Sequence, residues 1–461
     1  MQVGLANALL QLGKYPQALK EFQKATELDG KSSDAWYGLG ATYLSLEKQI
    51  ENQLRQANSP YRGLLLGESY LEQGQAEKAI ATLETAVHAG PDLKCSHAIL
   101  GFAYLRAGKR EEAATQFSLD WKEDSRRGCL LGKLGNAVLT VESGDRDRAS
   151  KVLQDINAID HDFISANSDW ARNQLPGPQV EVPNSLSETV PGPSEELAGE
   201  GRYSACSKSL AQQAGPKSMK DLKLESFCSF YSGRNDQVLR ATSDLLERSI
   251  ADPEALYWRI KALERAGLVS LDHGIELNPD SPSLHSLMGD MLRGKGDNAE
   301  AAVEYGKALS ENPDFIAAQL GLARSLYSDR RGADAEQQVR AVLEASPDDP
   351  GANYLEGEIL VDRRAYPQAL PFLLKALKVS PDEEPYVHAD LSSVYEDAGD
   401  LRKAISEMKE AVVVDIDGGY YYRLGHLYAR AGNKAEASEA LQESARRRHA
   451  VDAASQFQKA P

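Results

Sequence analysis

The sequence predicts an all-α solenoid of about twelve helical hairpins, and two columns of small residues are the basis for this prediction. The first column lies in the second half of the chain, with spacings of 34, 34, 35 and 33 residues, at Gly289, Ala323, Gly357, Ser392 and Gly425. The second column follows twelve residues later with the same spacings, at Ala301, Ala335, Ala369, Ala404 and Ala437. Self-similarity at such a period is typical of architectures whose units stack on their neighbours.

Each period reads as two short helices. Small residues recur where two helices approach closely, as at Gly357 on the first helix and Ala369 on the second. Apolar residues keep helical spacing around them, at Leu370, Leu373, Leu374 and Leu377. A proline column, at Pro313, Pro347 and Pro381, ends the second helix and turns the chain.

The first half carries the same columns, with two irregular units in the chain as a whole. The small residues there are Ala6, Gly40, Gly67 and Gly101, followed by Ala18, Ala79 and Ala113. Only 27 residues separate Gly40 from Gly67, so the intervening segment is expected to be one long helix or a shortened hairpin. A second irregular unit spans Ala255 to Pro282.

These two irregular units align at a single offset of 222 residues, with Trp36 matching Trp258 and Gly67 matching Gly289. The offset predicts a duplicated module, and the alternative is that two unrelated units lost a similar segment. By this alignment Met1 corresponds to Lys223, before which the second copy has further helical sequence. We therefore expect a natural N-terminal segment to be missing from the first copy.

The predicted domains are an N-terminal repeat module (1–169), a proline-rich linker (170–197) and a C-terminal repeat module (198–461). Five prolines interrupt the linker, at Pro176, Pro178, Pro183, Pro191 and Pro193. Such a stretch favours a linker or an ordered surface loop over a helix. The two modules are therefore predicted to be able to move relative to one another.

Composition limits the partners of the chain. The 461 residues carry a formal net charge of −17, which disfavours nucleic acid and anionic membrane surfaces. No apolar run approaches the roughly 18 residues that a membrane-spanning helix needs. Because the first residues show no basic signal-peptide region, a cytoplasmic location is the default, and a periplasmic or secreted one follows if an N-terminal segment is missing.

Motifs for catalysis, cofactors or metals are lacking, so the chain is predicted not to be an enzyme. The run Gly128 to Leu134 fails as a phosphate-binding loop because only three residues separate its glycines and leucine replaces the magnesium-binding hydroxyl. The eight histidines form no HExxH pair, and the four cysteines form no CxxC spacing. Cys206 and Cys228, on two predicted antiparallel helices, are a possible disulfide; two buried free thiols are the simpler alternative.

Two segments carry the clearest copies of the repeat. They are YYYRLGHLYARAGNKAEASEALQESA (Tyr420 to Ala445) and YRGLLLGESYLEQGQAEKAIATLETAVHAGP (Tyr61 to Pro91). Both resemble the tetratricopeptide repeat, with its Leu-Gly-x-x-Tyr first helix, its turn glycine and its second-helix alanine. The resemblance covers most of the chain and implies a multi-repeat, bacterial-like scaffold that binds peptides in a concave groove.

The resemblance also implies which residues face that groove, because the fifth, ninth and twelfth positions of each repeat are exposed there. Carried over to this chain, the groove residues are Asp290, Arg324, Tyr327, Tyr354, Glu358, Glu396, Tyr422 and His426, with Tyr386 one turn before the matching position of its helix. Tyrosine suits peptide recognition because it combines a large contact area with a polar tip. The alternative is that several of these tyrosines pack between repeats.

Some members of the family bind chaperone C-termini through a clamp of Lys, Asn, Asn, Lys and Arg. The matching positions here are Tyr354, Glu358, Asp390, Gly419 and Arg423, of which only Arg423 fits. We therefore expect no binding of that kind. The predicted function is a non-catalytic scaffold or adaptor for protein or peptide partners; the alternative is a regulatory or substrate-presenting arm of an enzyme or of a secretion or envelope assembly system.

Overall fold

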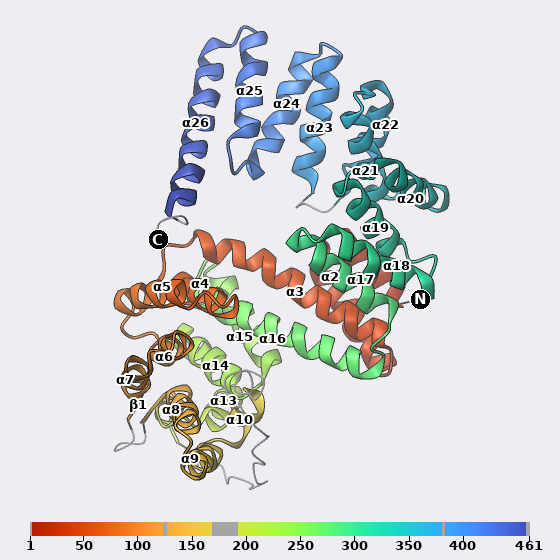
Figure 1. Cartoon of the computed structure of the whole chain (residues 1–461). Coiled ribbons are helices and arrows are strands. Elements are labelled where there is room, and N and C mark those ends of the chain that lie inside the picture. Colours follow the sequence, from red (N-terminus) through yellow and green to blue (C-terminus); the bar gives the residue numbers. More distant parts are fainter. Residues whose placement is uncertain (1, 123–126, 168–191, 380–382, 458–461) are drawn as a thin grey trace. The chain divides into compact units, whose positions relative to one another are not determined.

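The computed structural model describes residues 2–122, 127–167, 192–379 and 383–457. Within these ranges the chain forms 25 α-helices, one 3-10 turn (η1, Val412–Val414) and one pair of two-residue antiparallel strands. The strands β1 (Trp121–Lys122) and β2 (Arg127–Gly128) pair Trp121 with Gly128. The all-α repeat solenoid expected from the sequence is confirmed (Figure 1).

The chain packs into two compact units. Unit 1 comprises Met1–Thr42 and Ser270–Pro461, and unit 2 comprises Tyr43–Val269. The boundaries fall inside two long helices, α3 (Ser33–Gln56) and α16 (Pro253–Leu277). These are the two irregular units of the sequence, and the structure resolves each of them as a single long helix.

The remaining helices of unit 1 form hairpins of a first and a second helix. Before α3 they are α1 (Gln2–Gln11) and α2 (Tyr15–Leu28). After α16 they are α17 (Pro282–Lys295), α18 (Asn298–Glu311), α19 (Ile316–Ser328), α20 (Gly332–Ala345), α21 (Pro350–Asp362), α22 (Tyr366–Ala376), α23 (Glu384–Asp397), α24 (Leu401–Ala411), α25 (Gly419–Arg430) and α26 (Lys434–Phe457). The odd-numbered helices from α17 onward are the first helices of their hairpins.

Unit 2 continues the pattern with shorter and less regular pieces near its middle. Its helices between α3 and α16 are α4 (Pro60–Glu72), α5 (Ala76–Ala89), α6 (Ser96–Arg106), α7 (Arg110–Asp120), α8 (Leu130–Glu142), α9 (Arg146–Ile159), α10 (His161–Ala166), α12 (Ser194–Gly199), α13 (Tyr203–Ala211), α14 (Met219–Tyr231) and α15 (Asn235–Arg248). One hydrophobic core runs through them, from Leu54 to Ala262.

Direct contacts join the two chain segments that make up unit 1. The Tyr37 hydroxyl donates to the Asn278 carbonyl at 2.8 Å, across 241 residues of sequence. The rings of Trp36 and His273 lie 4.6 Å apart, edge to face. The start of α3 therefore packs on the end of α16, and residues 43–269 are inserted between two neighbouring helices of unit 1.

This division differs from the modules expected at 1–169 and 198–461. Helices on both sides of the expected linker belong to unit 2, where the Ser204 hydroxyl donates to Asp160 at 2.7 Å and the Tyr203 hydroxyl accepts from the Leu130 amide at 3.1 Å. Most of the expected linker, at 170–191, lies outside the described residues. Its last residues begin helix α12, which starts at Ser194.

The small-residue columns have a simple packing cause. A Cβ atom added at Gly101 would lie 2.5 Å from the Phe117 ring, and one added at Gly135 would lie 2.3 Å from the same ring. In unit 1 the Tyr305 ring lies in the same way between Gly289 and Gly321. In α7 and α18 a large side chain of the second helix thus occupies space that glycines of the flanking first helices leave open.

The helix bounds also repeat at the offset seen in the sequence. Pro60 and Pro282 begin α4 and α17, and Ala89 and Glu311 end α5 and α18, each pair 222 residues apart. The same spacing separates the starts of α7 and α20, at Arg110 and Gly332. A duplicated module predicts such equal bounds.

Candidate protein-binding surface

The predicted groove residues lie on the first helices of unit 1. We use the name first-helix surface for the side of α19, α21, α23 and α25 that carries the following residues: Arg324, Tyr327, Tyr354, Glu358, Tyr386, Asp390, Glu396 and Tyr422. Figure 1 shows α23 to α26 standing side by side in unit 1. The surface is built by repetition, because each of these first helices contributes residues to it.

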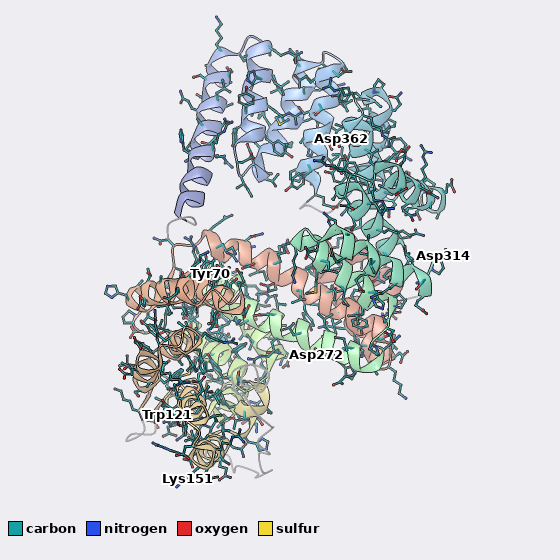
Figure 2. All side chains as sticks on the ribbon, in the orientation of Figure 1. Tyr70, Trp121, Lys151, Asp272, Asp314 and Asp362 are labelled. Atoms are coloured by element: carbon teal, nitrogen blue, oxygen red, sulfur yellow. A yellow bond between two sulfur atoms is a disulfide. The ribbon has the colours of Figure 1, made fainter. Side chains whose placement is uncertain are left out.

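Its central part is held together by polar contacts between repeats. The Arg324 guanidinium forms an ion pair with Glu383, at 2.6 Å, which links α19 to the residue that precedes α23. The Tyr327 hydroxyl donates to the carboxylate of Asp362, the last residue of α21 (labelled in Figure 2). Tyr354 and Glu358 lie on α21, between the two helices that the Arg324–Glu383 pair links.

Two carboxyl groups in this neighbourhood are poorly hydrated. Burial raises the pKa of Glu358 to about 7, with the negative charges of Asp362 and Glu383 adding to it and Arg324 opposing it. Burial likewise raises the pKa of Asp390 to about 7, together with the charge of Glu358. Both groups therefore titrate near neutral pH, because each is removed from water and faces other negative charges.

The C-terminal part of the surface is more open. The Arg430 guanidinium pairs with Glu396, and the Arg423 guanidinium donates to the Ser393 hydroxyl at 2.6 Å, so both arginines link α25 to α23. The rings of Tyr422 and His426 lie 4.4 Å apart on α25.

Asp290 lies apart from the other predicted groove residues. It accepts a hydrogen bond from the Tyr305 hydroxyl at 2.7 Å and lies 3.6 Å from the Arg293 guanidinium. The first of these contacts joins α17 to its own partner helix, α18. Asp290 therefore helps to hold the two helices of its own hairpin together.

The tyrosines divide into two groups. Tyr327 and Tyr354 are partly buried and pack against neighbouring hydrophobic clusters. Tyr386 and Tyr422 are 44% and 48% exposed. The packing alternative therefore describes the first pair, whereas the second pair is largely exposed.

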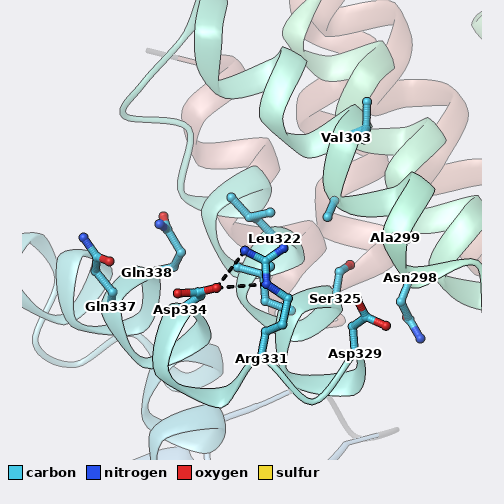
Figure 3. A pocket seen from close by; sticks show the side chains of 12 residues that line it. Asn298, Ala299, Val303, Leu322, Ser325, Asp329, Arg331, Asp334, Gln337 and Gln338 are labelled. Carbon is cyan, nitrogen blue, oxygen red and sulfur yellow. Dashed lines mark hydrogen bonds and ion pairs between the residues drawn. The ribbon is translucent and has the colours of Figure 1, made fainter.

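Two cavities lie away from this surface. One, of about 440 Å³, opens between α18, α19 and α20 of unit 1, and its lining includes Val303, Leu322 and the ion pair of Arg331 with Asp334 (Figure 3). The other, of about 1030 Å³, lies within unit 2 between the segment 89–95 and helices α12 and α14. In it the Lys94 ammonium lies 4.6 Å from the centre of the Phe227 ring.

The cysteines lie in two close pairs, both within unit 2. The sulfur atoms of Cys206 and Cys228 are 2.11 Å apart, between α13 and α14, and those of Cys95 and Cys129 are 2.02 Å apart. The second pair was not expected from the sequence. Its signal was present, since Cys95 and Cys129 are 34 residues apart and so occupy the same position of consecutive repeats.

A second group of poorly hydrated carboxyls lies in unit 2. Burial raises the pKa of Glu47 to about 7, with Glu51 and Glu264 adding to it. Burial also raises the pKa of Glu68 to about 7, although the Lys261 ammonium opposes this at 3.9 Å.

We expect the protein to become more stable as the pH falls from about 8 to about 5.5. Glu47, Glu68, Glu358 and Asp390 are ionised in the unfolded chain above their ordinary pKa values, near 4, but hold protons in the folded protein up to about pH 7. Between those values the folded state binds more protons, so its free energy of unfolding increases as the pH falls. The midpoint of thermal unfolding measures this change.

The variant Glu47→Gln serves as the comparison. It removes one of the four groups, so its unfolding midpoint should exceed that of the wild type at pH 8 and approach it at pH 5.5. A wild-type midpoint that is constant or falls as the pH is lowered across this range would contradict the prediction.

Comparison with known families finds four stretches of this chain that match the same repeat. Tetratricopeptide-repeat patterns match residues 6–46, 64–122, 292–359 and 418–448. The chain is a tetratricopeptide-repeat protein. A protein of this kind is a scaffold for protein–protein interactions, and the matches fall in both compact units.

Individual similar proteins match only parts of this tetratricopeptide-repeat protein. A curated relative, the BBSome complex member BBS4 of Bos taurus, is 28% identical over 115 residues, which are 24% of this chain and 22% of the relative. The matched stretch is thus about a fifth of that relative's length.

Several solved structures are similar to part of this chain at low identity. MamA 41-end from Desulfovibrio magneticus RS-1 is 20% identical, with a TM-score of 0.32, over 38% of this chain and 98% of its own. A thermophilic TPR protein of Thermus thermophilus, TTC0263, is 21% identical, with a TM-score of 0.31, over 36% of this chain and 91% of its own. YrrB, a TPR protein with an unusual peptide-binding site, is 20% identical, with a TM-score of 0.31, over 40% of this chain and 96% of its own.

Among the helices that the structure describes, none combines the length and the apolar character needed to cross a bilayer. The described residues also contain no group of three or more His, Cys, Asp or Glu side chains placed to hold a metal ion.

Proposed function

We propose that this tetratricopeptide-repeat protein is a non-catalytic adaptor that binds a protein or peptide partner on its first-helix surface. The observation that carries the proposal is the exposure of Tyr386 and Tyr422, at 44% and 48%, beside side chains that are already ordered by contacts between repeats. Exposed tyrosines on a rigid support contribute much of the binding energy in protein interfaces.

The order of the neighbouring polar side chains supports the same proposal. Arg423 and Arg430 are fixed by Ser393 and Glu396, so a partner would meet side chains whose entropy is already reduced. The similarity of one segment to a protein named as a member of a complex is consistent with an adaptor. The alternative function is a regulatory or substrate-presenting arm of an enzyme or assembly system, which would use the same surface.

The test is affinity purification from the native host with the wild type and with Tyr386→Ala/Tyr422→Ala. We expect partners captured by the wild type to be lost or reduced at least tenfold in the variant. Truncation of exposed side chains leaves the fold intact, so equal unfolding midpoints should accompany the loss.

The matched control is Val303→Ala/Leu374→Ala. It truncates two exposed side chains on second helices of unit 1, α18 and α22, with exposures of 59% and 47%. This control should retain the partners. Recovery of the same partners by the tyrosine variant would show that the binding surface lies elsewhere.

A further inference from the structure

On and beside the first-helix surface, arginines have partners within the chain, whereas two carboxylates form no ion pair among the described residues. Arg324 pairs with Glu383, and Arg430 pairs with Glu396. Arg423 donates to the Ser393 hydroxyl. Arg324 and Arg430 therefore have carboxylate partners already, whereas the partner of Arg423 is a neutral hydroxyl.

Two carboxylates of the same surface, Glu358 and Asp390, differ from these arginines in their contacts. Within the described residues, Glu358 and Asp390 accept no hydrogen bond and form no ion pair of their own, although Arg324 and Arg423 lie near enough to act on their charges. They lie on α21 and α23, and the charge of Glu358 acts on Asp390. A cation placed between them would relieve this repulsion.

The aromatic side chains on either side favour the same kind of ligand. Tyr354 stands one helical turn before Glu358 on α21, and Tyr386 stands one turn before Asp390 on α23. Tyrosine faces attract ammonium and guanidinium groups and also pack on the apolar stems that carry them. This pairing of aromatic and acidic groups complements lysine and arginine side chains.

We propose that the partner segment recognised by the first-helix surface is basic, with a lysine or arginine side chain placed between Glu358 and Asp390 and neighbouring residues packed on Tyr386 and Tyr422. This inference rests on the proposed function, because it names the chemistry of the partner bound by that same surface. Charge complementarity selects the occupant, since among the described residues Glu358 and Asp390 form no ion pair, whereas Arg324 and Arg430 already have carboxylate partners.

A linked proton release follows from this arrangement. Glu358 and Asp390, with pKa values of about 7, are partly protonated near neutral pH, and a bound cation favours their ionised forms. Binding should therefore release protons and become tighter as the pH rises from about 6 to about 8. It should also weaken with added salt, as expected for an interaction between opposite charges.

The experiment compares three short fluorescein-labelled peptides. In each of them leucine alternates with one other residue, which is lysine in the first peptide, glutamine in the second and glutamate in the third. Fluorescence anisotropy measures their binding to the full chain at low salt. We expect the lysine peptide to bind at least tenfold more tightly than the glutamine peptide and the glutamate peptide to bind least. The variant Glu358→Gln/Asp390→Asn should lose at least tenfold in affinity for the lysine peptide and lose the pH dependence.

A charge-matched control separates this site from the general acidity of the chain. The variant Glu300→Gln/Asp314→Asn removes two exposed carboxylates of unit 1 outside the first-helix surface, so it should leave the affinity within about twofold. If the carboxylate variant binds like the wild type, or if the glutamine peptide binds as well as the lysine peptide, the inference is overturned.

The outcomes also distinguish this inference from the proposed function. The variant Tyr386→Ala/Tyr422→Ala is compared in the same assay and in the affinity purification. Loss of native partners in the tyrosine variant, without a preference for the lysine peptide, would leave the adaptor function standing and exclude a basic partner. Partner capture that is unaffected by either double variant would overturn both.

Discussion

Replacing Phe117 by alanine is expected to lower the free energy of unfolding of unit 2 by about 3–5 kcal/mol. The Phe117 side chain is fully buried and lies against Gly101 and Gly135, one glycine from each flanking first helix. It also contacts the Phe102 ring edge to face, with ring centroids 4.8 Å apart. Its removal would leave a cavity between three helices, and glycines have no side chain that could fill it.

Chemical denaturation followed by circular dichroism measures this loss. The matched control is Leu119→Ala, two residues along the same helix, because Leu119 is 51% exposed. The control should change the free energy of unfolding by less than about 0.5 kcal/mol. Equal effects of the two substitutions would show that Phe117 is not the residue on which these repeats pack.

The second large effect concerns the cysteine pairs. If Cys206–Cys228 and Cys95–Cys129 form disulfides, they close loops of 22 and 34 residues. By the chain-entropy relation, each such crosslink stabilises the folded state by about 3–4 kcal/mol. Replacing all four cysteines by alanine should therefore destabilise unit 2 strongly, and adding a reductant to the wild type should do the same.

Thiol titration establishes the bonds themselves. The unreduced, denatured protein should show no reactive thiol, and the reduced protein should show four. Hydrogen exchange localises the effect: peptides from Tyr43–Val269 should lose protection on reduction, and those from Ser270–Pro461, where the sequence has no cysteine, should not. Four reactive thiols before reduction would exclude both disulfides.

Local contacts explain why so much of the fold can be predicted from the sequence. Each hairpin packs mainly on its neighbours, so the space that Gly101 leaves for Phe117 appears directly as a periodic small residue. The interruptions of the period at Gly40–Gly67 and at Ala255–Pro282 likewise marked two irregular units, which the structure resolves as the long helices α3 and α16. The residues of the first-helix surface follow from the same period, because corresponding positions of successive repeats lie on the same face of the first helix.

The pairing of residues across repeats is only partly visible in the sequence. Cys95 and Cys129 stand one period apart, and their spacing could have indicated their contact. The partners of Arg324 and Tyr327 could not be predicted in this way, because long side chains reach residues of more than one neighbouring repeat. Among the described residues, Glu358 and Asp390 form no ion pair, and this too depends on which partners the neighbouring long side chains contact.

The sequence by itself determined the all-α hairpin repeat, its period and the helix face that carries the candidate binding residues. Only the tertiary structure decided that the start of α3 packs on the end of α16, so that unit 1 is completed by segments from both ends of the chain. The physical reason is the range of the contacts. A repeat records which residues meet within about one period, whereas a contact such as that of Tyr37 with Asn278, 241 residues apart, depends on how two distant surfaces fit.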